Sequence, residues 1–175
     1  CYHGTQVAVS GIMSEIIWDW LLNDFDPKKV ELDKCYPSFE EMEPRVKAAF
    51  DWLDDTHNAA NECWADYQKK LQRWHDHKAE FKAFLESFDE FKKAVAPWVK
   101  KPEYIADCMH KANAPTRYSK LNFPVDGKTV RWAITNCHLM RNRFSVIDLL
   151  HFTGFWTDEF VQKLIERAEA MDAGL

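Results

Sequence analysis

The sequence predicts a mainly α-helical protein with one β-hairpin, and three observations lead to this fold class. Residues 45–96 contain neither glycine nor proline and keep one heptad register of mostly apolar side chains. Capping motifs and prolines divide most of the remaining chain into shorter helices. Residues 121–134 change to the alternating pattern that is typical of strands.

The region 45–96 is expected to be one long helix or a helical hairpin. Its register positions are Val46, Phe50, Leu53, His57, Ala60, Trp64, Tyr67, Leu71, Trp74, Lys78, Phe81, Leu85, Phe88, Lys92 and Val95. A single helix of this length would extend about 78 Å at 1.5 Å per residue. The poor helix formers at 54–58 could instead turn a hairpin, and Ser87 with Glu90 matches a capping box that would allow a break near residue 86.

The large residues of this stripe are mostly aromatic, whereas two-stranded coiled coils prefer Leu and β-branched residues. Trp and Phe suit an irregular helical bundle or an asymmetric partner surface. The stripe is therefore either the protein's own core or a coiled-coil-like interface.

Shorter helices are expected on both sides of this region. Their predicted places are a helix capped by Ser10 and ended by residues 23–27, a start at the Ser38–Glu41 capping box, and helices at 103–112, at 138–152 and after Thr157.

The β-hairpin is predicted at about 121–134. Asp126 and Gly127 are residues that tolerate the positive φ angles of a type I′ turn. Such a turn would place Leu121, Phe123 and Val125 on the same face as the apolar residues of the second strand.

Charge is distributed unevenly along the chain. Residues 1–91 hold ten Lys and Arg against nineteen Asp and Glu, whereas residues 92–143 hold eleven against three, a balance of +8. We therefore expect an acidic helical region at 1–96 and a basic β-hairpin module with two C-terminal helices at 97–175, as two parts or as one continuous domain.

The cysteines suggest an intracellular setting. Five are scattered without regular spacing in a chain of 175 residues, which is large enough to fold without disulfides. The chain begins at Cys1 instead of Met, which is compatible with an organellar location after removal of a targeting segment. No apolar run approaches the roughly 20 residues of a membrane span.

Candidate partner-binding residues come from the aromatic stripe and the basic module. They are Trp64, Trp74, Lys100, Lys101, Lys111, Arg117, Lys120, Lys128, Arg131, Arg141 and Arg143. Lys and Arg interleaved with aromatic residues could contact an acidic protein surface, or contact phosphates and stack on bases. The module could also dock on the acidic half of its own chain.

No pattern indicates catalysis, a metal or a cofactor. His75 and His77 point apart on a helix, and no Cys or His pair has zinc-site spacing. The five glycines form no phosphate-binding loop. Cys1 could act as an N-terminal nucleophile, but enzymes of that type need a large layered sheet. We therefore predict no enzyme.

Two function classes follow. The first is a non-catalytic structural or interaction subunit of a larger protein assembly, which binds other subunits through the aromatic-striped helix and the basic module. The alternative is a nucleic-acid-associated accessory factor that uses the basic residues of 92–143.

Overall fold

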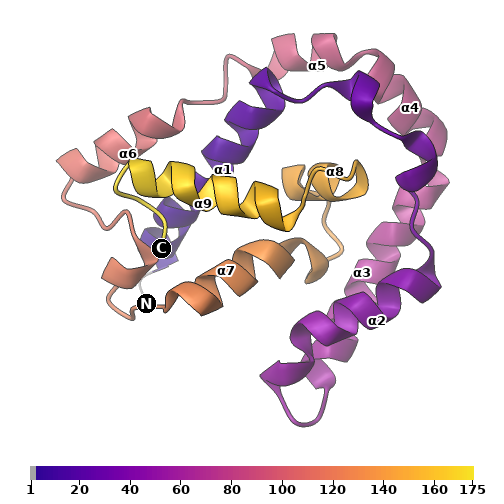
Figure 1. Ribbon diagram of the computed structural model, residues 1–175, viewed down its shortest axis with the longest axis horizontal. Coiled ribbons are helices and arrows are strands. Elements are labelled where there is room, and N and C mark those ends of the chain that lie inside the picture. Colours follow the sequence, from indigo (N-terminus) through magenta and orange to yellow (C-terminus); the bar gives the residue numbers. More distant parts are fainter. Residues whose placement is uncertain (1–2) are drawn as a thin grey trace. The chain divides into compact units, whose positions relative to one another are not determined.

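The computed structural model describes residues 3–175, which form nine α-helices and five short 3₁₀ helices (Figure 1). The α-helices are α1 (His3–Asn23), α2 (Phe39–Phe50), α3 (Asn58–Asp76), α4 (Lys78–Glu86), α5 (Phe88–Val95), α6 (Pro102–Lys111), α7 (Gly127–Asn136), α8 (Val146–Phe152) and α9 (Asp158–Ala170). The 3₁₀ helices are η1 (Pro27–Lys29), η2 (Leu32–Lys34), η3 (Asp51–Leu53), η4 (Tyr118–Lys120) and η5 (Cys137–Leu139). The mainly α class is therefore correct.

The predicted β-hairpin at 121–134 is wrong. Residues 121–126 are irregular, α7 follows, and no strand occurs anywhere in residues 3–175. The side chain of Asp126 accepts hydrogen bonds from the backbone N–H groups of Lys128 and Thr129, both at 3.0 Å, and from the Thr129 hydroxyl at 2.7 Å. These bonds satisfy donors that a helix start leaves unpaired, so Asp-Gly begins a helix here instead of turning a hairpin.

The region 45–96 is not one helix. Figure 1 shows α2 and α3 side by side and joined by a short loop, so they form a helical hairpin. The turn lies at 54–57, where His57 adopts a left-handed conformation with φ 59°. Asp54 stabilises the start of α3, because its carboxylate accepts from the backbone N–H groups of Asn58 and Ala59 at 3.1 and 2.9 Å. Further breaks at His77 and Ser87 separate α3, α4 and α5.

The helix limits follow several of the sequence signals. The Ser38–Glu41 capping box is present at the start of α2, with bonds of 2.8 and 3.1 Å. Thr157 caps α9 by accepting from the Phe160 N–H. Ser10 does not cap a helix, because α1 already begins at His3, and the predicted helix at 138–152 is reduced to η5 and α8.

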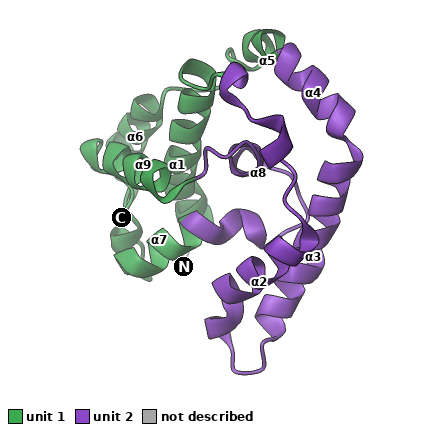
Figure 2. Ribbon diagram, turned by 45° about the vertical axis from the view of Figure 1, so that its right-hand side comes forward, with its two compact units in different colours: residues 1–26, 88–134, 157–175 green, residues 27–87, 135–156 purple. Residues whose placement is uncertain are grey.

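The chain folds into two compact units whose segments alternate along the sequence (Figure 2). Unit 1 contains residues 1–26, 88–134 and 157–175, and unit 2 contains residues 27–87 and 135–156. The expected division of the chain into an acidic region at 1–96 and a basic module at 97–175 stays a prediction.

The core of unit 1 is built around α1, which packs against α6 and α9. Its buried residues recur at helical spacing and are Val9, Ile12, Met13, Ile16, Ile17 and Leu21. Arg167 of α9 joins the three helices at the surface, since its guanidinium lies 2.7 Å from Asp19 of α1 and 3.1 Å from Glu103 of α6.

The core of unit 2 is largely aromatic. Trp74 of α3 stacks on Phe152 of α8 with ring centroids 4.6 Å apart, and it packs against Phe81 of α4 at 4.3 Å. Its indole N–H donates to the carbonyl oxygen of Cys35 at 2.7 Å. This part of the aromatic stripe is therefore internal core.

Candidate functional site

Two strongly exposed aromatic residues of unit 1 lie in a short segment that we call the basic–aromatic segment, residues 97–104. Trp98 is 82% exposed and Tyr104 is 59% exposed. Lys100 and Lys101 lie between them and are also exposed. Large aromatic side chains are enriched in protein interfaces, where Trp and Tyr contribute much of the binding energy. The two lysines add positive charge, which acts mainly on the choice of partner and on the association rate.

The backbone of this segment is held in place although its side chains are open to solvent. The Trp98 N–H donates to the Val95 carbonyl at 2.9 Å, and the Lys100 N–H donates to the Glu15 carboxylate of α1 at 3.2 Å. Pro102 then occupies the first turn of α6, where a proline removes no helical hydrogen bond. The chain therefore presents Trp98 from a fixed position, which lowers the entropy cost of binding.

A second exposed group follows η4. Phe123 is 65% exposed, and Lys120 and Lys128 near it in the sequence are exposed as well. These residues lie in the link before α7 and in its first turn, and not on the expected hairpin.

Three of the predicted basic residues in unit 1 already have partners within the unit. Lys111 pairs with Asp107 at 2.6 Å, Arg117 pairs with Asp172 at 2.8 Å, and Arg131 donates to the Gln162 amide oxygen at 2.5 Å. By contrast, the side chains of Lys100, Lys101, Lys120 and Lys128 make no hydrogen bond or ion pair with any residue in 3–175.

The other four predicted residues belong to unit 2. Trp74 is buried in the core, Trp64 is half-buried beside Tyr67 and Phe39, and Arg141 and Arg143 are exposed. The predicted set is thus divided between the units. Unit 1 holds eleven Lys and Arg against fourteen Asp and Glu, and unit 2 holds twelve against fourteen, so the charge asymmetry of the sequence does not produce a basic unit.

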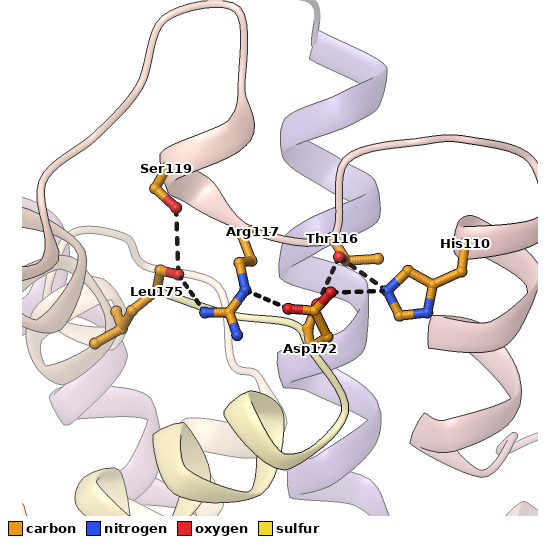
Figure 3. A network of polar contacts seen from close by, with 6 residues as sticks. All are labelled: His110, Thr116, Arg117, Ser119, Asp172 and Leu175. Atoms are coloured by element: carbon orange, nitrogen blue, oxygen red, sulfur yellow. Dashed lines mark hydrogen bonds and ion pairs between the residues drawn. The ribbon is translucent and has the colours of Figure 1, made fainter.

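Arg117 belongs to a clasp that holds the segment 172–175 (Figure 3). Its guanidinium donates to the Asp172 carboxylate and, at 3.0 Å, to the Leu175 carbonyl. Backbone bonds of 2.8 and 2.9 Å join Gly174 to Tyr118 and Thr116. The Thr116 hydroxyl donates to the Asp172 carbonyl at 2.7 Å. The Arg117 charge is therefore used within the unit and is not available to a partner.

Unit 2 contains a buried polar group that sequence reasoning missed. The Lys70 ammonium lies 2.5 Å from the Asp148 carboxylate, and each side chain is only 1% exposed. Lys70 also donates to the carbonyl oxygen of His138. Asp148 is held from its other side by the Ser145 N–H at 2.7 Å and the Ser145 hydroxyl at 2.9 Å.

Two histidines and a tyrosine complete this group, which we call the Lys70 cluster: Tyr67, Lys70, His138, Asp148 and His151. The Tyr67 hydroxyl lies 3.1 Å from Nε2 of His151, and the rings of His138 and His151 are 4.5 Å apart between centroids. His138 is 4% exposed, and neither of its ring nitrogens has a hydrogen-bond partner among the described residues.

Burial controls the protonation of these groups. Burial, with a smaller contribution from the Asp148 charge, raises the pKa of Tyr67 above its usual value, and burial lowers the pKa of His151 to about 3. It also lowers the pKa of His138 well below the usual value, with smaller contributions from His151, Lys70 and Arg45. For the ion pair, burial raises the pKa of Asp148 and lowers that of Lys70, while their mutual attraction opposes both changes.

A signal for the cluster was present in the sequence. In a helix, Lys70 lies on the same face as Tyr67, Leu71 and Trp74, which belong to the apolar stripe. Helical spacing therefore places its charge toward the core. A buried lysine needs an anionic partner, but the distant Asp148 could not be assigned from spacing alone.

The cluster does not form an open reaction site, because its lysine, aspartate and His138 side chains are almost completely enclosed. In residues 3–175, no group of three or more His, Cys, Asp or Glu side chains is arranged to hold a metal ion. Within the same range no helix is long and apolar enough to cross a membrane.

Comparisons with known proteins identify no relative. No family model matches the chain, and neither the curated proteins nor the solved structures contain a significant match.

Proposed function

We propose that this protein is a non-catalytic interaction subunit that binds an acidic protein surface through the basic–aromatic segment. The observation that carries the proposal is the 82% exposure of Trp98 on a backbone that is anchored to α1. A tryptophan buried at the centre of an interface typically contributes 2 kcal/mol or more to binding.

Charge selects the kind of partner. Lys100 and Lys101 lie between the two aromatic residues in the sequence and make no ion pair within the described chain. An acidic partner would neutralise both charges while it covers Trp98, and the complementary charges would accelerate association.

A protein partner is favoured over nucleic acid by the distribution of charge. Unit 1 carries a net charge of −3, with eleven basic and fourteen acidic residues. Its field therefore opposes a densely charged polyphosphate more strongly than a protein surface whose acidic residues are limited to a local patch. The predicted basic hairpin that would have entered a groove does not form.

Site-specific photo-crosslinking tests the proposal directly. A photoreactive phenylalanine analogue replaces Trp98 in the full chain expressed in cells, and a matched chain carries it at Phe123, an exposed aromatic residue of unit 1 that lies outside the segment. We expect a discrete protein adduct from position 98 that is lost with Lys100→Glu and Lys101→Glu. Crosslinks to nucleic acid, or no adduct from position 98, would contradict the proposal.

A further inference from the structure

The Lys70 cluster joins two parts of unit 2 that are distant in sequence. Tyr67 and Lys70 belong to α3, whereas the remaining members belong to η5 and α8 within residues 135–156. The same two parts also share aromatic contacts, including the stacking of Trp74 on Phe152. A change in the cluster therefore acts where residues 135–156 pack on α3.

We propose that the Lys70 cluster is an acid-operated latch: neutral His138 and His151 hold residues 135–156 against α3, and their protonation releases this segment. The inference is independent of the function proposed for the basic–aromatic segment, which lies in unit 1.

The surroundings of the two histidine rings disfavour a protonated, positively charged imidazole. The two imidazole rings are 4.5 Å apart, so a proton on one places a positive charge beside the other. His138 has no acceptor within hydrogen-bond distance of either ring nitrogen in residues 3–175. An imidazolium there would be buried with two unsatisfied donors, which is strongly unfavourable.

The charges around the rings add to this cost. The titratable and charged groups that face the two histidines are Arg45 from α2, Tyr67 and Lys70 from α3, Cys137 from η5 and Asp148 from α8. Two of these groups are cations. Asp148 is a carboxylate, but it already lies 2.5 Å from Lys70 and accepts two bonds from Ser145.

The direction of the pH effect follows from the shifted pKa values. Above pH 6.5, the ordinary value for histidine, both rings are neutral in the latched and the released forms. Below pH 6.5, both histidines bind protons in the released form. In the latched form, His151 binds a proton only near pH 3, and the pKa of His138 is also lowered. Acid therefore favours release, by roughly thirtyfold per histidine at pH 5.

Asp148 acts in the opposite direction over part of this range. Because burial raises its pKa, the latched form binds a proton on Asp148 more readily than the released form does. This contribution is confined to the interval between the raised pKa and the ordinary value of 3.8. The two histidines act in the opposite direction below pH 6.5, and the variants without them separate the two effects.

Hydrogen exchange with mass spectrometry on the full chain at pH 7.5 and pH 5.0 tests the latch. Protection is referred to the intrinsic exchange rate at each pH. At pH 5.0 we expect the amides of α8 to lose protection by at least roughly tenfold, while those of α9 in unit 1 keep theirs. The double variant His138→Phe and His151→Gln removes both titrating rings and leaves Gln as a hydrogen-bond acceptor for Tyr67. It should show equal protection at the two pH values.

His77→Gln provides the matched control, because His77 belongs to the same unit but is exposed and lies outside the cluster. It should respond to acid as the unchanged protein does. If the double variant does not fold, the single variants replace it. In each of them, the logarithm of the α8 protection factor should change between the two pH values by about half as much as in the unchanged protein. Unchanged protection of α8 at pH 5.0, equal loss in α8 and α9, or acid release in variants without the histidines would overturn the proposal.

Discussion

The Lys70 ammonium and the Asp148 carboxylate lie 2.5 Å apart in the interior of unit 2, where water reaches neither group. A buried pair of this kind contributes little compared with an apolar pair of the same size, since desolvation offsets the attraction. Removal of only one partner is different, because the other charge stays buried without compensation. The pair therefore makes the stability of unit 2 sensitive to single substitutions on either side.

We expect Lys70→Met to lower the free energy of unfolding by about 3–5 kcal/mol. Urea unfolding followed by circular dichroism at pH 7.5 measures this loss. The double variant Lys70→Met with Asp148→Leu should be more stable than Lys70→Met alone, because it leaves no unpaired charge. Equal stability of Lys70→Met and the unchanged protein would mean that the pair is not buried in solution.

The two tryptophans of the aromatic stripe should differ in their effect on stability. Trp74 is buried among Phe81, Phe144 and Phe152, so Trp74→Ala should cost about 3–5 kcal/mol. Trp64 is half-buried, so Trp64→Ala should cost clearly less. Thermal unfolding of the two variants checks the order, and a larger loss for Trp64 would contradict this packing.

Local signals in the sequence predicted much of the helical architecture. Ser38 with Glu41 and Thr157 each marked a helix start, because capping depends only on residues within one turn. The helical hairpin of α2 and α3 was one of two alternatives, and Asp54 decides between them by capping α3 across a sharp turn.

The failures have physical causes as well. Asp126-Gly127 suits both a type I′ turn and a helix start. The hydrogen bonds from Thr129 to Asp126 favour the helix, but the alternation of apolar residues, on which the hairpin prediction was based, gives no sign of them. The Lys70 cluster needed a contact between residues 70 and 148, which no local pattern encodes. Each compact unit is assembled from distant segments, so the charge balance of a unit is not that of a continuous stretch of sequence.

Gly174→Ala should weaken the clasp between Arg117 and the segment 172–175. Gly174 has φ 90°, and a Cβ atom there would lie 3.0 Å from the Cβ of Ala168. We expect a loss of about 1–3 kcal/mol, since a non-glycine residue is strained at this angle and the added atom would press on a buried residue of α9. Urea unfolding measures it.

Gly11→Ala is the matched control for this change. Gly11 lies inside α1, and an added Cβ meets no atom within 4 Å. Replacement of a helical glycine by alanine should raise stability by up to about 1 kcal/mol. Destabilisation by Gly11→Ala, or no effect of Gly174→Ala, would contradict the described backbone at these sites.

Charge reversal at Lys100 should weaken the proposed association with an acidic protein. We expect the change to keep the fold, because the Lys100 contact with Glu15 uses the backbone N–H and not the side chain. Once crosslinking at position 98 has identified the partner, surface plasmon resonance at 50 and 300 mM salt measures the association rate. Lys100→Glu should slow association at low salt, and the difference should shrink at high salt as ions screen the charges.

Lys163→Glu makes the same charge change on α9 of the same unit, outside the segment, and should have a much smaller effect. Equal effects of the two variants would show that net charge, and not the basic–aromatic segment, controls binding.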